Sequence, residues 1–302
     1  MERRFAGYEI EALIGRGGMA DVYRARTLAG PHAGQTVALK RLRPELAQDP
    51  QYLDLFHKEA TVTCRLCHPT CIEVFETGVV AGTPFIVMEY VDGRNLRQIL
   101  NQCAERGILL PLDFAAFLAH RVAEGLAHAH EGFDRSGQPL GIVHCDVSPS
   151  NVFISRLGEI KLGDFGVALA AGAEAPTSGG FGKIHYLAPE QIRGERPTPA
   201  TDLFALGAMT FELLTNAHAF PGKTVNEVGQ AILAGRLRAP SELRPEVPFD
   251  LDVLVLRCLA PKPEERWPSA AAFAEEIATR YDPSIGTPLA IASVVRGLFG
   301  LH

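Results

Sequence analysis

The sequence predicts an α+β fold in which a smaller sheet-rich region precedes a larger helical region. Residues 8–40 alternate polar and apolar side chains around glycines, which is the period of two expected of strands joined by tight turns. From Asn95 onward the apolar residues recur at spacings of three and four, the period of packed helices. Prolines separate these later segments, as loops between packed helices require.

The elements of the sheet-rich region follow from local patterns. Ala29–Gly34 contains glycine and proline and is predicted to form a hairpin tip between two strands. Residues 44–66 are predicted to form a helix, since four positions recur at spacings of three and four: Leu53, Phe56, Ala60 and Thr63. Ile72–Phe75 and Pro84–Val91 are predicted to be two further strands.

The helical region is predicted to contain an amphipathic helix at Ala115–Ala129 and further helices at Thr201–Leu214, Val225–Leu233, Leu251–Leu259 and Ser269–Arg280. The first of them carries His120, His128 and His130, for which packing is the expected role. The tail, residues 281–302, is apolar and is predicted to be helical, without an identified role.

Composition excludes several classes of protein. Of the 302 residues, 47% are hydrophobic and 21% charged, which is typical of a folded globular protein and excludes wholesale disorder. Lysine and arginine number 29 against 35 aspartates and glutamates, so the net charge of −6 gives no bulk attraction for nucleic acid or anionic lipid. Six cysteines in such a chain form no disulfide framework. The sequence shows neither a signal peptide nor a membrane span, which predicts a soluble, cytoplasmic protein of unassigned oligomeric state.

A glycine-rich turn begins at Ile14 and has the spacing G-x-G-x-x-A, with Gly15, Gly17 and Gly18 as its glycines. Dinucleotide-binding folds use the same spacing, but they place a helix directly after the glycines. Here the strand-like segment Asp21–Arg26 follows. A strand–turn–strand flap brings backbone N–H groups close to phosphates, and an ordinary glycine-rich hairpin is the alternative.

Four later motifs occur in a specific order after this turn. They are Val37-Ala38-Leu39-Lys40, the loop from His144 through Asp146 to Asn151, Asp164-Phe165-Gly166, and Ala188-Pro189-Glu190. Together with the turn, this order resembles the protein kinase superfamily, and most closely the bacterial serine/threonine kinases of the eukaryotic-like (Hanks) type. The resemblance covers residues 8–280 and implies a bilobal kinase fold, with an N-lobe over about 8–91 and a C-lobe over about 95–280.

The resemblance implies an ATP- and Mg²⁺-dependent enzyme of bacterial signalling that phosphorylates Ser or Thr in proteins, with the chain itself as one candidate substrate. It assigns Lys40 to the α- and β-phosphates, with Glu59 as its ion-pair partner. Asp146 matches the residue that orients the substrate hydroxyl and accepts its proton. Asn151 and Asp164 match the metal ligands, which implies that these side chains converge with Lys40 around a metal-bound nucleotide.

The remaining nucleotide contacts are also implied by the resemblance. Adenine is expected between Val22 and Ala38 on one side and Phe153 on the other. Glu89–Val91 resembles the hinge that binds adenine through its backbone, with Met88 before it. The implied nucleotide-binding residues are therefore Ile14, Gly15, Gly17, Gly18, Val22, Ala38, Lys40, Glu59, Met88, Glu89, Val91 and Phe153. The resemblance also implies two structural roles. Asp202 is expected to be a buried acid that binds the catalytic-loop backbone, and Glu190 and Arg266 are expected to form a buried ion pair.

The chain departs from the family pattern at four positions. Ala20 replaces the third glycine of the turn, and Cys145 replaces the arginine that usually precedes the catalytic aspartate. Without that arginine, phosphorylation at Thr177 or Ser178 is not the expected on-switch. Ser148 stands where the family has a lysine, and Lys183 where it has a threonine. We hypothesise that Lys183 supplies the missing positive charge, and a surface lysine facing the peptide substrate is the alternative.

These motifs also allow other interpretations. Cys145 and Ser148 would suit a non-catalytic pseudokinase scaffold, and a small-molecule kinase of similar fold is a further alternative. Cys64, Cys67, His68 and Cys71 could form a zinc cluster, but Pro69 interrupts the segment and favours a turn. Residues 222–224 resemble the end of a phosphate-binding loop, yet Ala217 stands where that motif needs a glycine, so a loop entering a helix is predicted.

Overall fold

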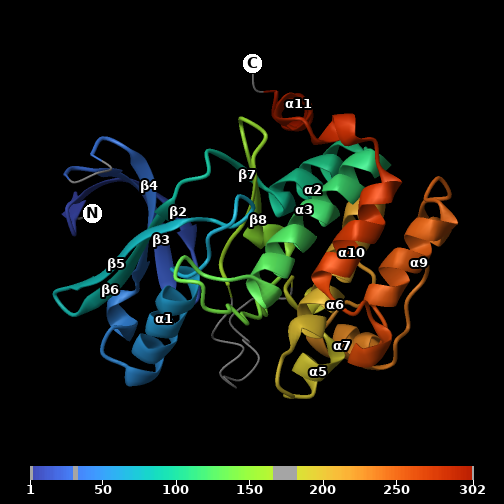
Figure 1. Cartoon of the computed structure of the whole chain (residues 1–302), viewed down its shortest axis with the longest axis horizontal. Coiled ribbons are helices and arrows are strands. Elements are labelled where there is room, and N and C mark those ends of the chain that lie inside the picture. The colour runs from blue at the N-terminus through green and yellow to red at the C-terminus, as the bar shows by residue number, and fades with distance from the viewer. Residues whose placement is uncertain (1–2, 30–32, 166–181, 301–302) are drawn as a thin grey trace. The chain divides into compact units, whose positions relative to one another are not determined.

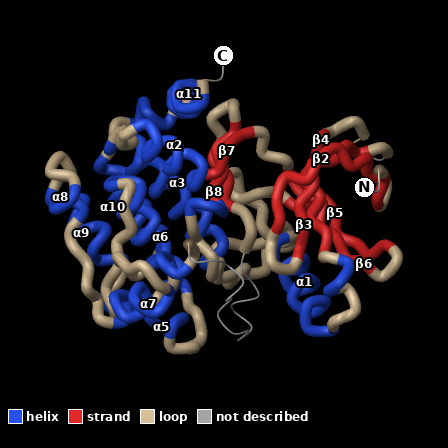
Figure 2. Tube along the Cα trace, turned by 180° about the vertical axis from the view of Figure 1, so that it is seen from behind, coloured by secondary structure: helices blue, strands red, loops and turns tan. Residues whose placement is uncertain are grey.

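The computed structural model describes residues 3–29, 33–165 and 182–300 (Figure 1). The chain divides into two compact units, each with its own internal contacts. The first consists of Met1–His68 and Ile72–Val91, and the second of Pro69–Cys71 and Asp92–His302. Strands dominate the first unit and helices the second (Figure 2).

The first unit contains a six-stranded antiparallel sheet in the order β1-β2-β3-β4-β6-β5. Its strands are β1 (Arg4–Phe5), β2 (Tyr8–Arg16), β3 (Ala20–Thr27), β4 (Thr36–Leu42), β5 (Val74–Val80) and β6 (Thr83–Glu89). Neighbours in this order are also neighbours along the chain except at β4, which pairs with β6. The β4 strand therefore has a partner on both sides.

The two faces of this sheet bury different clusters because side chains alternate along each strand. In β4, Val37 and Leu39 belong to an aromatic-rich cluster on one face. Leu42 belongs to the other face, where it packs with Phe56 and Ala60 of α1 (Pro50–Thr63). Complete burial of a side chain the size of Phe56 contributes roughly 1.5–3 kcal/mol. Alternation thus directs every second residue of β4 toward α1.

The second unit combines a small sheet with helices. The sheet is antiparallel and has the order β7-β8-β9, with strands Gly93–Asn95, Val152–Ser155 and Ile160–Leu162. The α-helices are α2 (Leu96–Arg106), α3 (Leu112–Glu131), α5 (Pro189–Ile192), α6 (Pro199–Thr215), α7 (Val225–Leu233), α8 (Pro240–Leu243), α9 (Phe249–Cys258), α10 (Ala270–Ile277) and α11 (Pro288–Phe299). Short 3-10 turns occur at Pro44–Leu46, Pro149–Asn151, Ile184–Tyr186, Pro263–Glu265, Ala278–Arg280 and Pro283–Gly286.

Helix α6 forms the centre of the second unit. Every residue from Thr201 to Leu214 is buried, so the helix has no solvent face, as expected of a central core helix. It packs against α3 and α9. A Cβ atom on Gly207 would lie 2.4 Å from the Cβ of Cys258, so α6 and α9 approach closely enough to require glycine there.

Several elements differ from the sequence-based prediction. Residues 44–66 form a 3-10 turn and then α1, because Pro50 begins the helix and Asp49 caps it through the Gln51 N–H. The strand predicted at 72–75 begins only at Val74 and continues to Val80. This strand lies at the edge of the sheet and is largely exposed, so it lacks the apolar pattern that marks buried strands. Helix α2 was not predicted.

The tail of the chain contains α11, which packs on α2 and β8. Its inner face buries Ile291, Val295 and Leu298. The guanidinium of Arg94 lies 5.1 Å from the Phe299 ring, within range of a cation–π contact. None of the helices in the described ranges has the length and apolar character needed to cross a bilayer.

Candidate functional site

The glycine-rich turn connects two strands, as predicted. β2 ends at Arg16 and β3 begins at Ala20, so no helix follows the glycines. The turn is closed by the Gly17 N–H, which donates to the Ala20 carbonyl at 2.8 Å. A Cβ atom on Gly17 would lie 3.0 Å from that oxygen, a tight contact that favours a residue without a side chain.

Lys40 and Glu59 form a largely buried ion pair, with side-chain exposures of 12% and 8%. Lys40 and Leu42 are two residues apart on β4, so their side chains lie on the same face of the sheet, which α1 covers. Glu59 lies one helical turn from Phe56 on the buried side of α1. The packing of α1 therefore brings together a pair that the resemblance had implied.

Some of the other candidate nucleotide-binding residues of the first unit lie next to Lys40 in the sheet. Val22 pairs with Lys40 across β3 and β4, and Ala38 pairs with Met88 across β4 and β6. Ile14 is 46% exposed at the end of the flap. The Glu89 backbone N–H donates to the Glu73 carbonyl at 2.9 Å.

Asp202 organises the loop that contains Asp146. Its carboxylate accepts the backbone N–H groups of His144 and Cys145, each at 2.7 Å, and contacts Nε2 of His130 at 2.7 Å. Nδ1 of His144 accepts the Asp146 N–H at 3.2 Å, so its Nε2 carries the proton that is donated to the Gly163 carbonyl at 3.1 Å. Burial lowers the pKa of His144, which favours this neutral form.

Asp146 is held by residues on both sides. The Asn151 amide nitrogen donates to the Asp146 carboxylate at 2.9 Å and to its backbone carbonyl at 2.8 Å. Lys183 Nζ contacts the same carboxylate oxygen, Oδ2, at 2.5 Å. Ser148 lies two residues after Asp146 in the sequence. Its hydroxyl is buried and has no hydrogen-bond partner among the described residues. The positive charge at Asp146 thus comes from Lys183.

The two candidate metal ligands lie at the end of the small sheet. Asp164 follows β9 by two residues, and the intervening Gly163 N–H donates to the Asn151 carbonyl at 2.9 Å. Since Asn151 uses its amide nitrogen on Asp146, its amide oxygen is the atom suited to a cation. A carboxylate and an amide oxygen are the hard ligands that Mg²⁺ prefers, so these residues fit such an ion. Phe153, on β8, pairs with Asn95.

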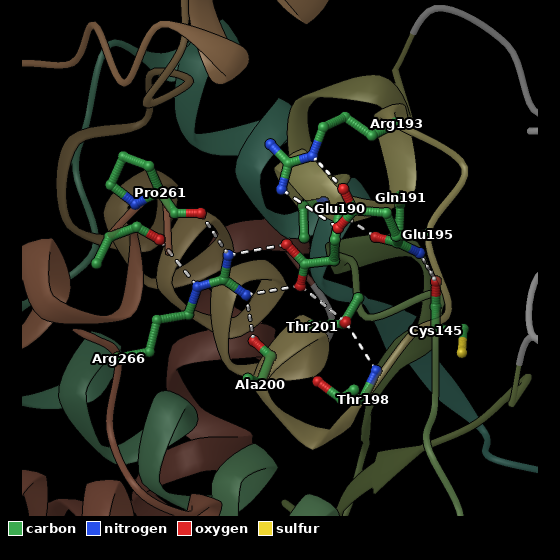
Figure 3. A network of polar contacts seen from close by, with 12 residues as sticks. Cys145, Glu190, Gln191, Arg193, Glu195, Thr198, Ala200, Thr201, Pro261 and Arg266 are labelled. Carbon is green, nitrogen blue, oxygen red and sulfur yellow. Dashed lines mark hydrogen bonds and ion pairs between the residues drawn. The ribbon is translucent and has the colours of Figure 1, made fainter. Parts of the chain in front are cut away.

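Cys145 has a structural rather than a redox environment. Burial raises the pKa of its thiol far above the usual range, which disfavours the reactive thiolate form. Its backbone adopts φ of +65°, in the left-handed region, and both of its backbone polar groups are bonded. The N–H donates to Asp202. The carbonyl accepts from Nε2 of Gln191 at 3.1 Å (Figure 3).

Glu190 and Arg266 form the expected buried ion pair (Figure 3). Two guanidinium nitrogens donate to the two carboxylate oxygens at 2.7 and 2.9 Å, and the remaining donors reach the carbonyls of Ala200, Ala260 and Pro261. Burial disfavours the ionised Glu190, but the bonds from Arg266 outweigh it and hold the pKa of Glu190 below its usual value. The pair joins α5, α6 and the segment after α9.

A second buried network, which the sequence analysis missed, anchors the segment that follows Lys183. Tyr186 and Arg97 both contact the carboxylate of Glu212 on α6, with the Arg97 nitrogens at 2.7 and 3.0 Å. Glu212 stands inside the apolar run 201–214, and a buried acid in such a run signals a polar partner. The network fixes residues 184–186 to the central helix.

Three groups of predicted features remain. Gly166, Thr177 and Ser178 lie outside the described residues. Cys64 and Cys67 are exposed and Cys71 is buried, and nowhere in the described ranges do three metal-ligating side chains gather. Residues 222–224 enter α7 as predicted, with Thr224 accepting the Glu227 N–H as its N-cap.

Most of the chain is similar in sequence to known protein kinases. Residues 8–277 match the family profile described as "Protein kinase domain". The chain is 35% identical over 277 residues to the "Tyrosine-protein kinase MasK" of Myxococcus xanthus, covering 91% of this chain and 43% of that protein. It is 35% identical over 278 residues to the "Serine/threonine-protein kinase PknB" of Mycobacterium tuberculosis, covering 89% and 42%. The corresponding values for the "Serine/threonine-protein kinase PrkC" of Bacillus subtilis are 32% over 283 residues, covering 93% and 41%.

Solved structures show the same likeness. The crystal structure of the Mycobacterium tuberculosis PknI kinase domain, C20A mutant, superposes with a TM-score of 0.69 at 28% identity and covers 92% of this chain and 96% of that one. The chain spans about two fifths of the length of the curated relatives it matches.

Proposed function

The chain belongs to the protein kinase family, and we propose that it transfers the γ-phosphoryl group of ATP to Ser or Thr hydroxyls of proteins, with Mg²⁺ as cofactor. The observation that carries this proposal is the arrangement at Asp146, whose carboxylate is oriented by Asn151 and Lys183. A hydroxyl placed at this carboxylate could lose its proton to it. Such a positioned base typically contributes about 10²–10⁴ in rate.

The remaining groups position and neutralise the triphosphate in this proposal. Lys40, which Glu59 holds on the sheet, would contact the phosphates, and the backbone of the Gly15–Gly18 flap would cover them. Asn151 and Asp164 would hold Mg²⁺, which when bound would neutralise the charge of the phosphates. Positioning can contribute up to about 7–11 kcal/mol, so we expect it to outweigh proton transfer.

Lys183 is proposed as a catalytic residue that replaces the lysine expected at position 148. Its ammonium contacts the Asp146 carboxylate from the segment before the 3-10 turn at Ile184–Tyr186. From there it would reach both the reacting hydroxyl and the transferred phosphoryl group. The buried hydroxyl of Ser148 supplies no positive charge.

The test is a transfer assay with γ-³²P-labelled ATP, the purified chain and a Ser/Thr peptide library. We expect incorporation by the wild type and a loss of at least 100-fold in Asp164→Asn, which removes a metal ligand but keeps the side-chain volume. Incorporation equal in the two proteins would contradict the proposal.

Phosphoamino-acid analysis of the product addresses the acceptor, because one relative is named a tyrosine kinase and two are named serine/threonine kinases. We expect phosphoserine and phosphothreonine. Phosphotyrosine alone would overturn the acceptor assignment while leaving the transfer reaction in place.

A further inference from the structure

A cavity of about 680 Å³ lies in the second unit, beside the segment that carries Lys183. It is open to solvent on one side and is lined by the 3-10 turn at residues 184–186, the end of α6 and its following loop, and the segment after α7. Most of its wall is apolar, with Phe211, Leu237 and Leu243 as its larger apolar side chains. The size suits one or two side chains of a bound peptide.

The charged residues that line this cavity are both positive. They are Arg236 and Arg238, whose side chains are exposed, and no acidic residue is among the lining residues. Neither guanidinium has an ion-pair partner within the described ranges. Two acidic residues on neighbouring segments already have partners. Glu212 accepts from Arg97, and Glu242 accepts the Ala239 N–H at 2.7 Å.

Two stacked imidazoles complete the wall. The rings of His185 and His218 lie 3.7 Å apart at an interplanar angle of 9°. Burial lowers the pKa of both, and for His185 it reaches about 4, so the stack is neutral near pH 7. Nδ1 of His218 is buried without a hydrogen-bond partner in the described part of the chain. The cavity therefore combines neutral polar and apolar walls with two uncompensated positive charges.

The cavity is close to Asp146 along one continuous segment. Lys183 contacts the Asp146 carboxylate, while His185 lines the cavity. Two residues separate these positions by at most about 7 Å of backbone. A peptide whose hydroxyl lies at Asp146 could therefore place a flanking side chain in the cavity.

We propose that this cavity binds an acidic side chain, Asp or Glu, of the substrate peptide that flanks the phosphorylated residue. The inference rests on the proposed function. It adds a substrate class, namely protein segments in which an acidic residue flanks the Ser or Thr. A carboxylate would be attracted to Arg236 and Arg238, and its methylene groups would contact the apolar wall. Arginine pairs bidentately with carboxylates, which gives the interaction a defined geometry.

The test begins with a positional peptide library that has a central Ser or Thr and one Asp moved from five residues before it to five after. We expect one position to lower KM about three- to tenfold relative to Asn at the same place, with kcat unchanged. The variant Arg236→Gln/Arg238→Gln should remove that preference and leave the KM of the Asn peptide unchanged. Because the interaction is electrostatic and exposed, 0.5 M NaCl should reduce it in the wild type.

The matched control is Arg193→Gln/Arg196→Gln, which removes the same two charges from exposed positions that do not line the cavity. It should keep the preference for Asp. An equal loss in the control, or an unchanged preference in Arg236→Gln/Arg238→Gln, would overturn the proposal.

A binding measurement separates this inference from the proposed catalysis. Fluorescein-labelled Asp and Asn library pools are titrated with the chain without nucleotide, and their anisotropy is compared. Tighter binding of an Asp pool that is lost in Arg236→Gln/Arg238→Gln supports the cavity even if no phosphate is transferred. Equal binding of the two pools at every position, or no binding by either, overturns it even if transfer occurs.

Discussion

Ser148 and Lys183 show how one charge can reach a site from a different place in the chain. The serine hydroxyl is buried without a partner among the described residues, while the lysine of the later segment contacts the Asp146 carboxylate. The role thus falls to a residue 37 positions after Asp146 and not to the residue two positions after it. The positive charge beside Asp146, the proposed base, therefore depends on where the segment containing Lys183 lies.

A charge exchange tests this role. Lys183→Thr should lower kcat about 100-fold, the typical cost of removing one group that stabilises developing charge. Adding Ser148→Lys to that variant should recover at least tenfold, because the positive charge returns beside Asp146. Initial rates at saturating ATP measure both effects, and Ser148→Lys alone is the control for disturbance of the loop. A double variant as inactive as Lys183→Thr would contradict the role.

The stacked histidines predict a pH-dependent stability. Burial, and then the neighbouring His218, lower the pKa of His185 to about 4, whereas an unfolded histidine has about 6.5. Between these values the unfolded state binds more protons than the folded state, so the free energy of unfolding decreases as the pH falls.

Urea unfolding at pH 7 and pH 5 measures this effect. The loss for one such histidine is at most about 1.4 kcal/mol per pH unit below 6.5, or roughly 2 kcal/mol at pH 5. His185→Gln keeps a donor for the Phe220 carbonyl but does not titrate, so its loss should be smaller. Equal losses in the two proteins would exclude His185 as the source.

At the scale of elements, buried charge pairs join segments that are distant in the sequence. Arg266 reaches α5 through Glu190 and α6 through the Ala200 carbonyl, and its side chain has 0% exposure. The Arg97–Glu212–Tyr186 network fixes residues 184–186 to α6 in the same way. These connections hold the segment that carries Lys183 relative to the loop that carries Asp146.

Removing one partner of a buried pair leaves the other uncompensated. We expect Arg266→Met to lower the free energy of unfolding by about 3–5 kcal/mol. The exposed pair Arg193–Glu195 provides the control, and Arg193→Gln should leave the free energy of unfolding nearly unchanged because surface ion pairs contribute little. Urea unfolding followed by circular dichroism compares the two. A loss in Arg266→Met no larger than in Arg193→Gln would contradict a role for this pair in joining the helices.

At the scale of the whole molecule, nucleotide and metal should stabilise the chain together. A ligand that binds only the folded state at 100 times its Kd adds about 2.7 kcal/mol. For a chain of 302 residues, whose unfolding entropy is about 0.6 kcal/mol/K, that corresponds to a Tm increase of roughly 4–5 °C. Thermal unfolding with ATP and MgCl₂ should show this increase, and EDTA should remove most of it.

Asp164→Asn is the matched control for that measurement. It should lose the part of the shift that depends on Mg²⁺ and keep the Tm of the ligand-free protein within a few degrees. A shift that is equal with Mg²⁺ and with EDTA would show that the metal makes no contribution to binding.

Much of the architecture could be predicted because its signals are local. The helix at 225–233 follows from the spacing of its apolar residues, and the flap follows from glycines between alternating segments. Edge strand β5 was placed poorly because its exposed face gives no apolar alternation. Helix α2 was missed, although its capping box at Asn95 and Gln98 and its terminal Gly107 are standard boundary signals.

The sequence by itself determined the family and the residue types of the candidate site, because motif order and spacing survive without coordinates. Only the tertiary structure decided which groups touch. It placed Lys183 on Asp146, left the Ser148 hydroxyl without a partner in the described ranges, and gathered Arg236 and Arg238 at one cavity. The reason is that these contacts depend on how separate segments pack on α6, and local periodicity carries no information about that packing.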